Sequence, residues 1–576
     1  MPSVRSKKSK TPLVSAPQPA APPLADRVLD FLAKRATILA LALIALATIR
    51  IVSTYTVFNH TSDEPAHIAC GMQWLESHVY RYEPQHPPLT RVMVALLPYL
   101  TGVRGNNRDE MTFEGDTILY IGNQYDRRLA LSRAGNLPFF WLACWMVFLW
   151  GRRIFGDAAA VIAVLIFSMT PTLLAHAGLS TTDIGVTAAM AAALYATVRF
   201  LEQPALRTTI WLGVTLAIMI LAKFSALVYY PAALGVAATW WLASTRPGAN
   251  EIWRHLRKPI LWAAAAVPLV FFLVWAGYWF SFGKTPEVPF KVPFPELFAG
   301  IGQVAKHNRE GHLGYLLGQL RMDGWWYFFP ALLAFKLPIG MLALMAAGIF
   351  VVGRFKSDAN SPKSSSPAQP WPYWLTLAIP IGIMIVAMSS RINIGLRHIL
   401  PMFPFLALIA AGGAIYLLRK PGQLAQAGCG IAILWMCASS LAAHPDYIPY
   451  FNAFAGDNPE KITVDSDLDW GQDIKRLGAR LKELNAPSVT FTPTIVTSLQ
   501  YHGFPAHQQS AYDGPDPGWN AVQITEWKLY RMGLQLEHKS GPTWPDVMQP
   551  VERVGKTILL YYVPPQSAAP VVPTGR

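Results

Sequence analysis

The run ATILALALIALATIRIVSTYTVF, residues 36–58, decides the fold of this chain because it is long, apolar and almost uncharged. A bilayer core about 30 Å thick needs about 20 apolar residues in a spanning helix, so this segment is predicted to cross a membrane. HTSDEPAHIACGMQWL, residues 60–75, follows almost directly. It places an aspartate, a glutamate and a histidine where the chain should reach water, and these are the first candidates for a functional site.

The composition of the whole chain agrees with a membrane protein. Of its 576 residues, 52% are hydrophobic and only 14% are charged, whereas a soluble domain carries roughly 25% charged residues. Apolar stretches recur along the chain, and we predict about eleven transmembrane helices from their lengths. The predicted spans are residues 36–58, 130–150, 157–177, 183–201, 208–222, 226–244, 259–282, 327–352, 373–390, 398–418 and 425–443.

Basic residues predict the orientation of these spans. Lysines and arginines precede the first span and then cluster in every second loop, after the second, fourth, sixth, eighth and tenth spans. The positive-inside rule makes those loops cytoplasmic. The N-terminus is then cytoplasmic, and the C-terminal tail lies outside a plasma (inner) membrane. The basic residues of the cytoplasmic loops account for the formal charge of +14, so this charge does not predict a nucleic-acid partner.

Composition also divides the chain into three parts. Residues 1–28, rich in Pro, Ser, Ala and Lys, are predicted to be a disordered cytoplasmic leader. Residues 29–443 form the transmembrane part, with two long outer loops at 59–128 and 283–326; the first loop contains a short apolar stretch, 89–100, predicted to be a helix at the membrane surface.

Residues 444–576 are predicted to form a small extracytoplasmic α/β domain. An amphipathic helix is expected over 471–484, where apolar residues recur at helical spacing. Runs of β-type residues predict strands in KITVD (461–465), SVTFTP (488–493), NAVQIT (520–525) and KTILLYYV (556–563). The fold class is therefore a polytopic α-helical membrane protein with a small α/β domain at its C-terminus.

Polar residues gather on the predicted outer face. A charge near the bilayer costs a few kcal/mol unless it is partnered, so acids and bases on one face suggest a site at that interface. These residues are Asp63, Glu64, His67 and His86 in the first outer loop, Asp183 at the start of the fourth span, Lys336 in the eighth, and Arg391 and Arg397 beside the tenth.

Each of these groups also has a structural interpretation. Asp63 could be one of the acids that favour a helix start, with Ser62 as the N-cap. QHPPLTR, residues 85–91, could be only a turn before a helix, and Asp183 could be a capping acid. Asp465, Asp467 and Asp469 resemble a calcium loop, but Trp470 replaces the required turn glycine. We interpret this acidic cluster as structural, a strand end followed by a helix start.

Taken together, several motifs resemble a known family. They are DEPAH (63–67), HPPL (86–89), the aspartate that opens the fourth span, FKLPIG (335–340) and GLRHILPMFPFLAL (395–408). Their order and sidedness resemble the GT-C glycosyltransferases. Within that class the chain is most similar to family 39 and its bacterial relatives, the phospholipid-carrier-dependent glycosyltransferases related to protein O-mannosyltransferases and aminoarabinose transferases. VDSDLDWGQDIKRL (464–477) resembles the outer-domain signature of a bacterial branch.

This resemblance implies a function for the polar residues. It implies transfer of a hexose or pentose from a polyprenyl-phosphate carrier to an acceptor, on the outer face of the membrane and with inversion. The resemblance assigns Asp63 as general base, with Glu64 beside it, and Asp183 as the second acidic residue, which binds the acceptor or orients the site. His67, His86, Lys336, Arg397 and, as a second candidate, Arg391 would bind the substrate and the carrier phosphate.

A second function stays open from the sequence alone. A multi-span transporter or lipid flippase would also explain many spans, but it would place its polar site near the bilayer midplane. The sequence shows no metal-ligand set, so the metal is unknown; no cofactor is certain, and a divalent cation stays open. The predicted partners are a lipid-linked sugar donor, membrane lipids and an unknown acceptor, which could be a protein, a lipid or an envelope glycan.

Overall fold

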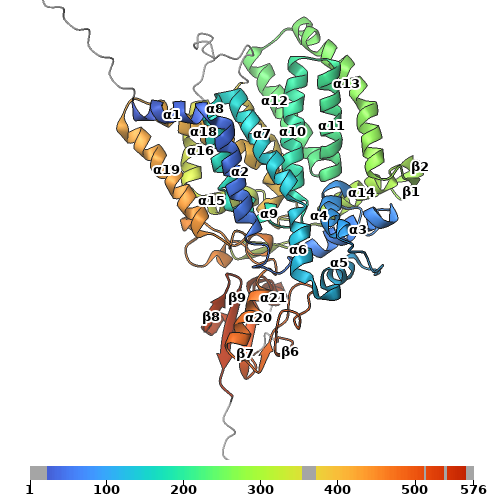
Figure 1. Cartoon of the computed structure of the whole chain (residues 1–576), viewed down its shortest axis with the longest axis vertical. Coiled ribbons are helices and arrows are strands. Elements are labelled where there is room, and N and C mark those ends of the chain that lie inside the picture. Colours follow the sequence, from blue (N-terminus) through green and yellow to red (C-terminus); the bar gives the residue numbers. More distant parts are fainter. Residues whose placement is uncertain (1–22, 353–371, 511–513, 537–540, 566–576) are drawn as a thin grey trace, which may run out of the picture.

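The computed structural model describes residues 23–352, 372–510, 514–536 and 541–565, and it is mostly helical (Figure 1). The helices before residue 280 are α1 (Leu24–Lys34), α2 (Ala36–Val52), α3 (Glu64–Ser77), α4 (Pro88–Leu100), α5 (Met111–Tyr120), α6 (Tyr125–Ala134), α7 (Leu137–Phe155), α8 (Asp157–Ser168), α9 (Pro171–Ala177), α10 (Asp183–Glu202), α11 (Leu206–Ala222), α12 (Ala226–Thr245) and α13 (Ala249–Gly277). The later helices are α14 (Pro295–Glu310), α15 (Phe328–Lys336), α16 (Ile339–Val352), α17 (Leu375–Met388), α18 (Phe403–Arg419), α19 (Gln423–Ala442), α20 (Ile474–Glu483), α21 (Ile524–Leu536) and α22 (Trp544–Val547).

The described residues contain six helices that are long and apolar enough to cross a membrane, or up to nine if each bent pair counts as one span. The bent pairs are α1 with α2, α8 with α9, and α15 with α16. Every predicted span coincides with apolar helix, but the count of eleven is not confirmed. α11 and α17 have only 17 and 14 residues, fewer than the about 20 that a straight crossing needs.

The predicted span over 327–352 is wrong as a single helix. α15 and α16 meet there at 119°. Pro338 explains the break, because a proline disfavours helical backbone at the residue before it. Leu337 accordingly has φ −82° and ψ 140°, which is extended backbone.

α10 and α18 lie at the centre of the helix bundle, where almost all of their side chains are buried, whereas α13 and α19 are mostly exposed and form its periphery. Small residues let the central backbones approach each other closely. A Cβ atom on Gly348 of α16 would lie 2.0 Å from the carbonyl oxygen of Ile409 on α18. A Cβ atom on Gly413 of α18 would likewise lie 2.0 Å from the carbonyl oxygen of Leu344. Both glycines are therefore required by packing.

The two predicted outer loops gather at one end of the bundle, opposite α1 (Figure 1). The first contains α3, α4 and α5, so the helix predicted over 89–100 is observed as α4. The second contains α14 and two antiparallel hairpins, β1 (Phe282–Thr285) with β2 (Val288–Pro293) and β3 (Gly314–Leu316) with β4 (Gln319–Arg321). At the N-terminus, α1 begins at Leu24, so residues 24–28 of the predicted leader are helical, while residues 1–22 lie outside the described residues.

The C-terminal segment forms a five-stranded sheet at the same end of the bundle (Figure 1). Its strand order is β6-β5-β7-β9-β8, with β5 parallel to both neighbours and β9 antiparallel to both of its own. The strands are β5 (Ser488–Thr490), β6 (Ala506–Gln508), β7 (Gly518–Gln523), β8 (Glu552–Val554) and β9 (Ile558–Val563). The predicted amphipathic helix is observed as α20, which buries Leu477 and Leu481 against the sheet.

Three of the four predicted C-terminal strands are observed, and KITVD (461–465) is not. The run begins in a 3₁₀ helix that ends at Lys461, Ile462 has φ −93° and ψ −59°, and Asp465 has φ +59°, so the backbone is not extended at either end. The amide of Asp465 donates to the Thr525 hydroxyl instead of to a neighbouring strand.

Candidate active site

An ion pair between Asp63 and Arg397 forms the centre of the candidate site. Asp63 is the N-cap residue of α3, but its side chain makes no capping hydrogen bond. Its Oδ2 accepts a hydrogen bond from Nη1 of Arg397 at 2.8 Å, and the Asp63 side chain remains 34% exposed. The guanidinium of Arg397 also lies over the ring of Trp470, 4.4 Å from its centroid. The predicted helix start is observed, but Asp63 rather than Ser62 is its N-cap residue, and the accessible Asp63 carboxylate pairs with a buried cation instead of capping the helix.

Asp183 forms a second, fully buried ion pair next to the first. It begins α10, and its Oδ1 lies 2.5 Å from Nζ of Lys223, in the turn between α11 and α12. The N-cap residue Thr182 makes no side-chain capping bond, and Asp183 does not cap the helix either. Asp183 also interacts electrostatically with Arg397 and His176. The structure thus gathers two carboxylates and two cations in one cluster.

Several buried polar atoms around these pairs have no hydrogen-bond partner among the described residues. They are Asp183 Oδ2, Arg397 Nε, His398 Nε2, His176 Nδ1, Ser180 Oγ and Thr181 Oγ1. Buried polar atoms are nearly always hydrogen-bonded in proteins, because an unpaired one costs about 1–3 kcal/mol. A concentration of them on α9, on the turn before α10 and on the short 3₁₀ helix before α18 is typical of a site that binds a polar ligand.

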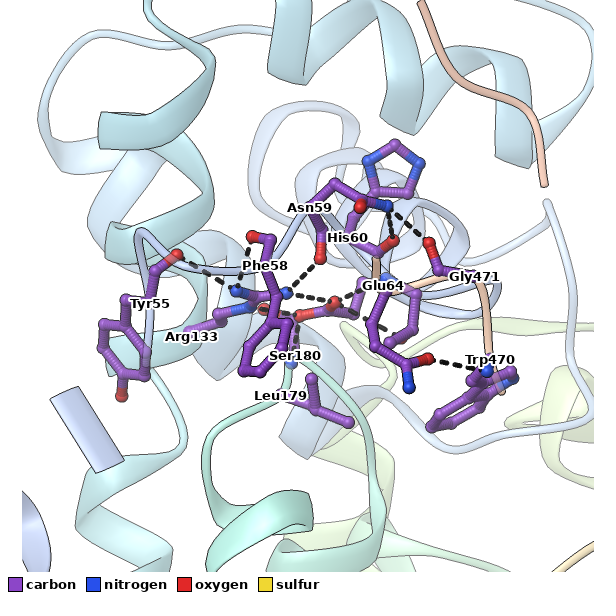
Figure 2. Close-up of polar contacts among 12 residues, drawn as sticks. Tyr55, Phe58, Asn59, His60, Glu64, Arg133, Leu179, Ser180, Trp470 and Gly471 are labelled. Atoms are coloured by element: carbon purple, nitrogen blue, oxygen red, sulfur yellow. Dashed lines mark hydrogen bonds and ion pairs between the residues drawn. The ribbon is translucent and has the colours of Figure 1, made fainter. Parts of the chain in front are cut away.

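Glu64 is buried behind this cluster and is fully occupied by protein donors (Figure 2). Arg133 donates from Nε and Nη2 to the two carboxylate oxygens at 2.9 and 2.8 Å. The backbone amides of Ser180 and Thr61 donate to the same carboxylate at 2.9 and 2.8 Å. Burial alone would raise the pKa of Glu64, but Arg133 and these donors hold it below its usual value. The carboxylate ties the Asp63 turn to the turn before α10 and leaves no free acceptor position.

His67 and His86 lie on the other side of the cluster and share the buried Arg91 of α4. Arg91 Nε donates to Nδ1 of His67 at 2.9 Å, and its Nη2 contacts Nδ1 of His86 at 3.2 Å. Nη2 of Arg91 also forms an ion pair with Glu83 at 2.5 Å. Burial and the neighbouring guanidinium lower the pKa of His67 well below its usual value, so its imidazole is neutral. Residues 85–91 are therefore more than a turn before a helix, because His86 and Arg91 belong to an extensive polar network.

A cavity of about 440 Å³ opens beside the cluster. His86, Lys223 and His398 line its polar end, and apolar side chains of α12, α14 and α17 line the remainder, among them Leu227, Val228, Ile301, Val304 and Val386. A second, almost entirely apolar cavity of about 690 Å³ continues along the same two helices, α12 and α17, lined by Ala232, Val236, Trp240, Ile381 and Ile385. Both cavities are lined by α12 and α17, and we call them together the α12–α17 groove; the first of them is also lined by Lys223 of the charged cluster.

Lys336 and Arg391 donate hydrogen bonds to protein carbonyl groups away from the charged cluster. Nζ of Lys336 is buried and donates to the carbonyl oxygens of Ile448 and Asp467 at 2.7 and 2.6 Å. Arg391 is exposed, and its Nη1 donates to the carbonyl oxygen of Arg309 at 3.1 Å. Neither residue lines the polar end of the groove. Lys336 instead holds the C-terminal segment against α15.

Sequence reasoning missed Lys223, Arg133 and Arg91. Lys223 carried a readable signal, because it is the only charged residue between Arg207 and Arg246. Isolated charges in such apolar stretches usually serve a function. Arg133 lies inside the predicted span 130–150 and Arg91 inside the apolar stretch 89–100, but their partners are fixed only by the folded chain. No group of three or more His, Cys, Asp or Glu side chains that could hold a metal ion occurs in the described parts of the chain.

Comparison with known proteins adds independent information. Residues 137–279, which include Asp183 and Lys223, match the family model described as dolichyl-phosphate-mannose-protein mannosyltransferase. No curated protein matches the chain.

The solved structures that resemble this chain are distant from it. ArnT from Cupriavidus metallidurans bound to undecaprenyl phosphate is 12% identical with a TM-score of 0.47, and the match covers 90% of this chain and 97% of ArnT. The archaeal oligosaccharyltransferase AglB from Archaeoglobus fulgidus, in complex with an inhibitory peptide and a dolichol-phosphate, is 13% identical with a TM-score of 0.43, covering 70% and 56%. The S. cerevisiae protein O-mannosyltransferase Pmt1-Pmt2 complex bound to the sugar donor is 15% identical with a TM-score of 0.33, covering 42% and 33%. The family match covers residues 137–279 and, of the motifs above, only the aspartate that opens the fourth span; over these residues the chain is similar to the dolichyl-phosphate-mannose-protein mannosyltransferases, in agreement with the family resemblance found in the sequence.

Proposed function

We propose that the protein transfers a sugar from a polyprenyl-phosphate carrier to an acceptor hydroxyl or amine on the outer face of the membrane. One observation carries this proposal: a largely apolar cavity reaches Lys223, which belongs to a cluster of two carboxylates and two buried cations. A lipid-linked sugar needs both parts, because its tail is apolar and its phosphate is anionic. The name of the matched family model, which includes dolichyl-phosphate-mannose, supports the same class of donor.

The polyprenyl tail would occupy the α12–α17 groove, and the phosphate its polar end. Lys223 and His86 line that end, and Arg397 is the neighbouring cation. Arginine and lysine bind phosphate oxygens through charge-assisted hydrogen bonds, which are roughly twice as strong as neutral ones. Lys336 and Arg391 donate to protein carbonyls, and we leave them out of this phosphate site.

The transfer is a direct displacement at the anomeric carbon. Asp63 takes the proton of the acceptor hydroxyl while the hydroxyl oxygen forms the new bond to this carbon. The bond between the carbon and the carrier phosphate breaks on the opposite face. The polyprenyl phosphate leaves as an anion that is stable at neutral pH, so no general acid has to protonate it. Arg397 and Lys223 stabilise the negative charge that develops on it. This geometry inverts the anomeric configuration.

The remaining acids position these groups. Asp183 holds Lys223 at the polar end of the groove through their 2.5 Å ion pair. Glu64 fixes the turn that carries Asp63, because all its acceptor positions are taken by protein donors. We therefore propose a positioning role for Glu64 in place of the catalytic role that the sequence suggested.

The location of the cluster favours this function over transport. Asp63 precedes α3, Asp183 begins α10 and Arg397 precedes α18, so all three lie at helix ends. Arg397 pairs with Asp63 and lies over Trp470 of the C-terminal segment, and α3 to α5 and the C-terminal sheet gather at one end of the bundle (Figure 1). A transporter would hold its polar site near the middle of the spans.

A panel of labelled donors tests the proposal. We expect the purified protein to release polyprenyl phosphate from at least one polyprenyl-phosphate sugar carrying mannose, glucose, arabinose or an amino sugar. Unlabelled undecaprenyl phosphate should compete with that donor. Use of nucleotide sugars in place of every lipid-linked donor would contradict the proposal.

The charge of Lys223 gives a second prediction. Lys223→Gln keeps a hydrogen-bond donor for Asp183 but removes the cation from the groove, so we expect the KM for the donor to rise about tenfold. Steady-state kinetics with varied donor measure this. Lys306→Gln removes the same charge from an exposed position of α14, where Lys306 pairs only with Glu310, and should leave the KM unchanged. An unchanged donor KM in Lys223→Gln would exclude a phosphate role for this residue.

A further inference from the structure

The acidic segment that follows residue 463 is largely structural. The carboxylate of Asp467 accepts from the amide of Leu396 at 3.1 Å. The carboxylate of Asp469 accepts from the amides of Thr525 and Gly471 at 3.0 and 3.2 Å. Asp467 and Asp469 therefore have structural roles, but the predicted strand end before them is absent, and their donors come from other segments as well as from the neighbouring turn.

This segment forms a wall of the candidate active site. The amide of Ser62, next to Asp63, donates to the carbonyl oxygen of Trp470 at 3.2 Å. The ring of Trp470 lies under the guanidinium of Arg397. Nδ2 of Asn59 donates to the carbonyl oxygen of Gly471 at 2.7 Å (Figure 2). The C-terminal segment therefore contacts Arg397 directly and holds Ser62, the residue next to Asp63.

The same segment packs against the chain just before Arg397. The Ser466 hydroxyl donates to the carbonyl oxygen of Ile394 at 2.5 Å. Gly395, with φ +154°, leaves room for this contact, because a Cβ atom there would lie 2.3 Å from Oγ of Ser466. This contact fixes Ser466, which follows Asp465, against the backbone just before Arg397.

Asp465 differs from the other aspartates of this segment. It is half-buried, and its carboxylate accepts only from the amide of the adjacent Ser466, with no ion pair among the described residues. It interacts electrostatically with Arg397 and Asp63. Its φ of +59° is unusual for a residue with a side chain. Such strained positions cluster at functional sites, where the surrounding structure maintains them.

We infer that Asp465 is the acceptor-binding carboxylate of the site, which accepts a hydrogen bond from the acceptor hydroxyl or amine and orients it toward Asp63. This inference rests on the proposed glycosyl transfer. A donor phosphate would be repelled by two neighbouring carboxylates, and the groove for the carrier begins at Lys223, His86 and His398 instead. An uncharged hydroxyl or a cationic amine is attracted by the same carboxylates. The C-terminal segment then supplies the acceptor side of the active site.

The pH dependence of acceptor use should reflect Asp465. Burial raises its pKa to about 6, Arg397 lowers it, and Asp63 and Asp467 add to the rise. Because this pKa is raised, the carboxylate becomes neutral as the pH falls through about 6. The KM for the acceptor should therefore increase below that pH, and Asp465→Asn should flatten this part of the profile.

The decisive experiment compares acceptor and donor kinetics in Asp465→Asn. Asparagine tolerates a positive φ, so the backbone can be retained while the charge is lost. The acceptors are a Ser/Thr-rich peptide, which offers hydroxyls, and a lysine-rich peptide and an amino-sugar glycan, which offer amines. We expect the acceptor KM to rise about tenfold or more, with binding of undecaprenyl phosphate retained. Asp457→Asn removes the same charge from an exposed position shortly before this segment and should not change acceptor use.

Asp465→Gly provides a second variant, because glycine relieves the strained backbone while removing the carboxylate. It should raise the acceptor KM at least as much, and its thermal unfolding should show an intact protein. A normal acceptor KM in both variants, with Asp63→Asn inactive, would overturn this inference and leave the proposed function standing. Absence of transfer by the wild type with every donor would overturn both.

Discussion

Asp63→Asn should lower kcat for sugar transfer at least 100-fold, because a positioned general base contributes about 10²–10⁴ to the rate. The substitution is conservative in shape. The asparagine carbonyl can still accept a hydrogen bond from Nη1 of Arg397, which lies 2.8 Å from Oδ2 of Asp63. It cannot accept the acceptor proton, so chemistry is lost while the local geometry is retained. Single-turnover transfer from the best donor of the panel measures this loss directly.

Two comparisons separate a base from a merely structural ion pair. Asp109→Asn removes a carboxylate from an exposed position of the same outer region and should leave kcat unchanged. Arg397→Gln removes the partner of Asp63 and should weaken donor use as well as chemistry, because Arg397 also faces Asp183 and the carrier site. Unaltered transfer by Asp63→Asn would remove this residue from the mechanism.

The local parts of this site could be predicted from the sequence. The charged motifs stood at the ends of apolar runs, and the alternation of basic loops placed those ends on one face, so the neighbourhood of Asp63, Asp183 and Arg397 was expected. The helix over 471–484 and the strand that contains Ile558 followed from their own periodicities. Each of these features depends on residues close together in the chain.

The pairings across long sequence distances could not be predicted. Lys336 stands in a motif that suggested a phosphate ligand, yet its partners are carbonyl oxygens 112 and 131 residues away. Asp465 and Asp467 belong to one short motif, yet the Asp467 carboxylate binds the distant amide of Leu396, whereas the Asp465 carboxylate accepts only from the adjacent Ser466 among the described residues. Which of two similar side chains binds a substrate depends on what packs against it. Spacing alone carries no information on that.

Glu64→Ala should lower the free energy of unfolding by about 3–5 kcal/mol, because it leaves the charge of the buried Arg133 without a partner. Both side chains are at most 1% exposed, so water cannot replace the lost contacts. The variant also removes the acceptor for the amides of Ser180 and Thr61. Unfolding in detergent with increasing SDS, followed by tryptophan fluorescence, measures the change.

A double variant and a surface control identify the origin of this loss. Glu64→Met combined with Arg133→Met replaces the pair by apolar side chains and should recover much of the stability, because a buried ion pair contributes little net free energy over a packed apolar pair. Asp30→Ala breaks the exposed pair with Lys34 on α1 and should cost roughly 0.5 kcal/mol or less. Transfer by the stable double variant then separates the two roles of Glu64. If Glu64 only positions the Asp63 turn, the stable double variant should recover part of the activity. If the double variant is stable but has lost all transfer, the Glu64 carboxylate takes part in the chemistry itself.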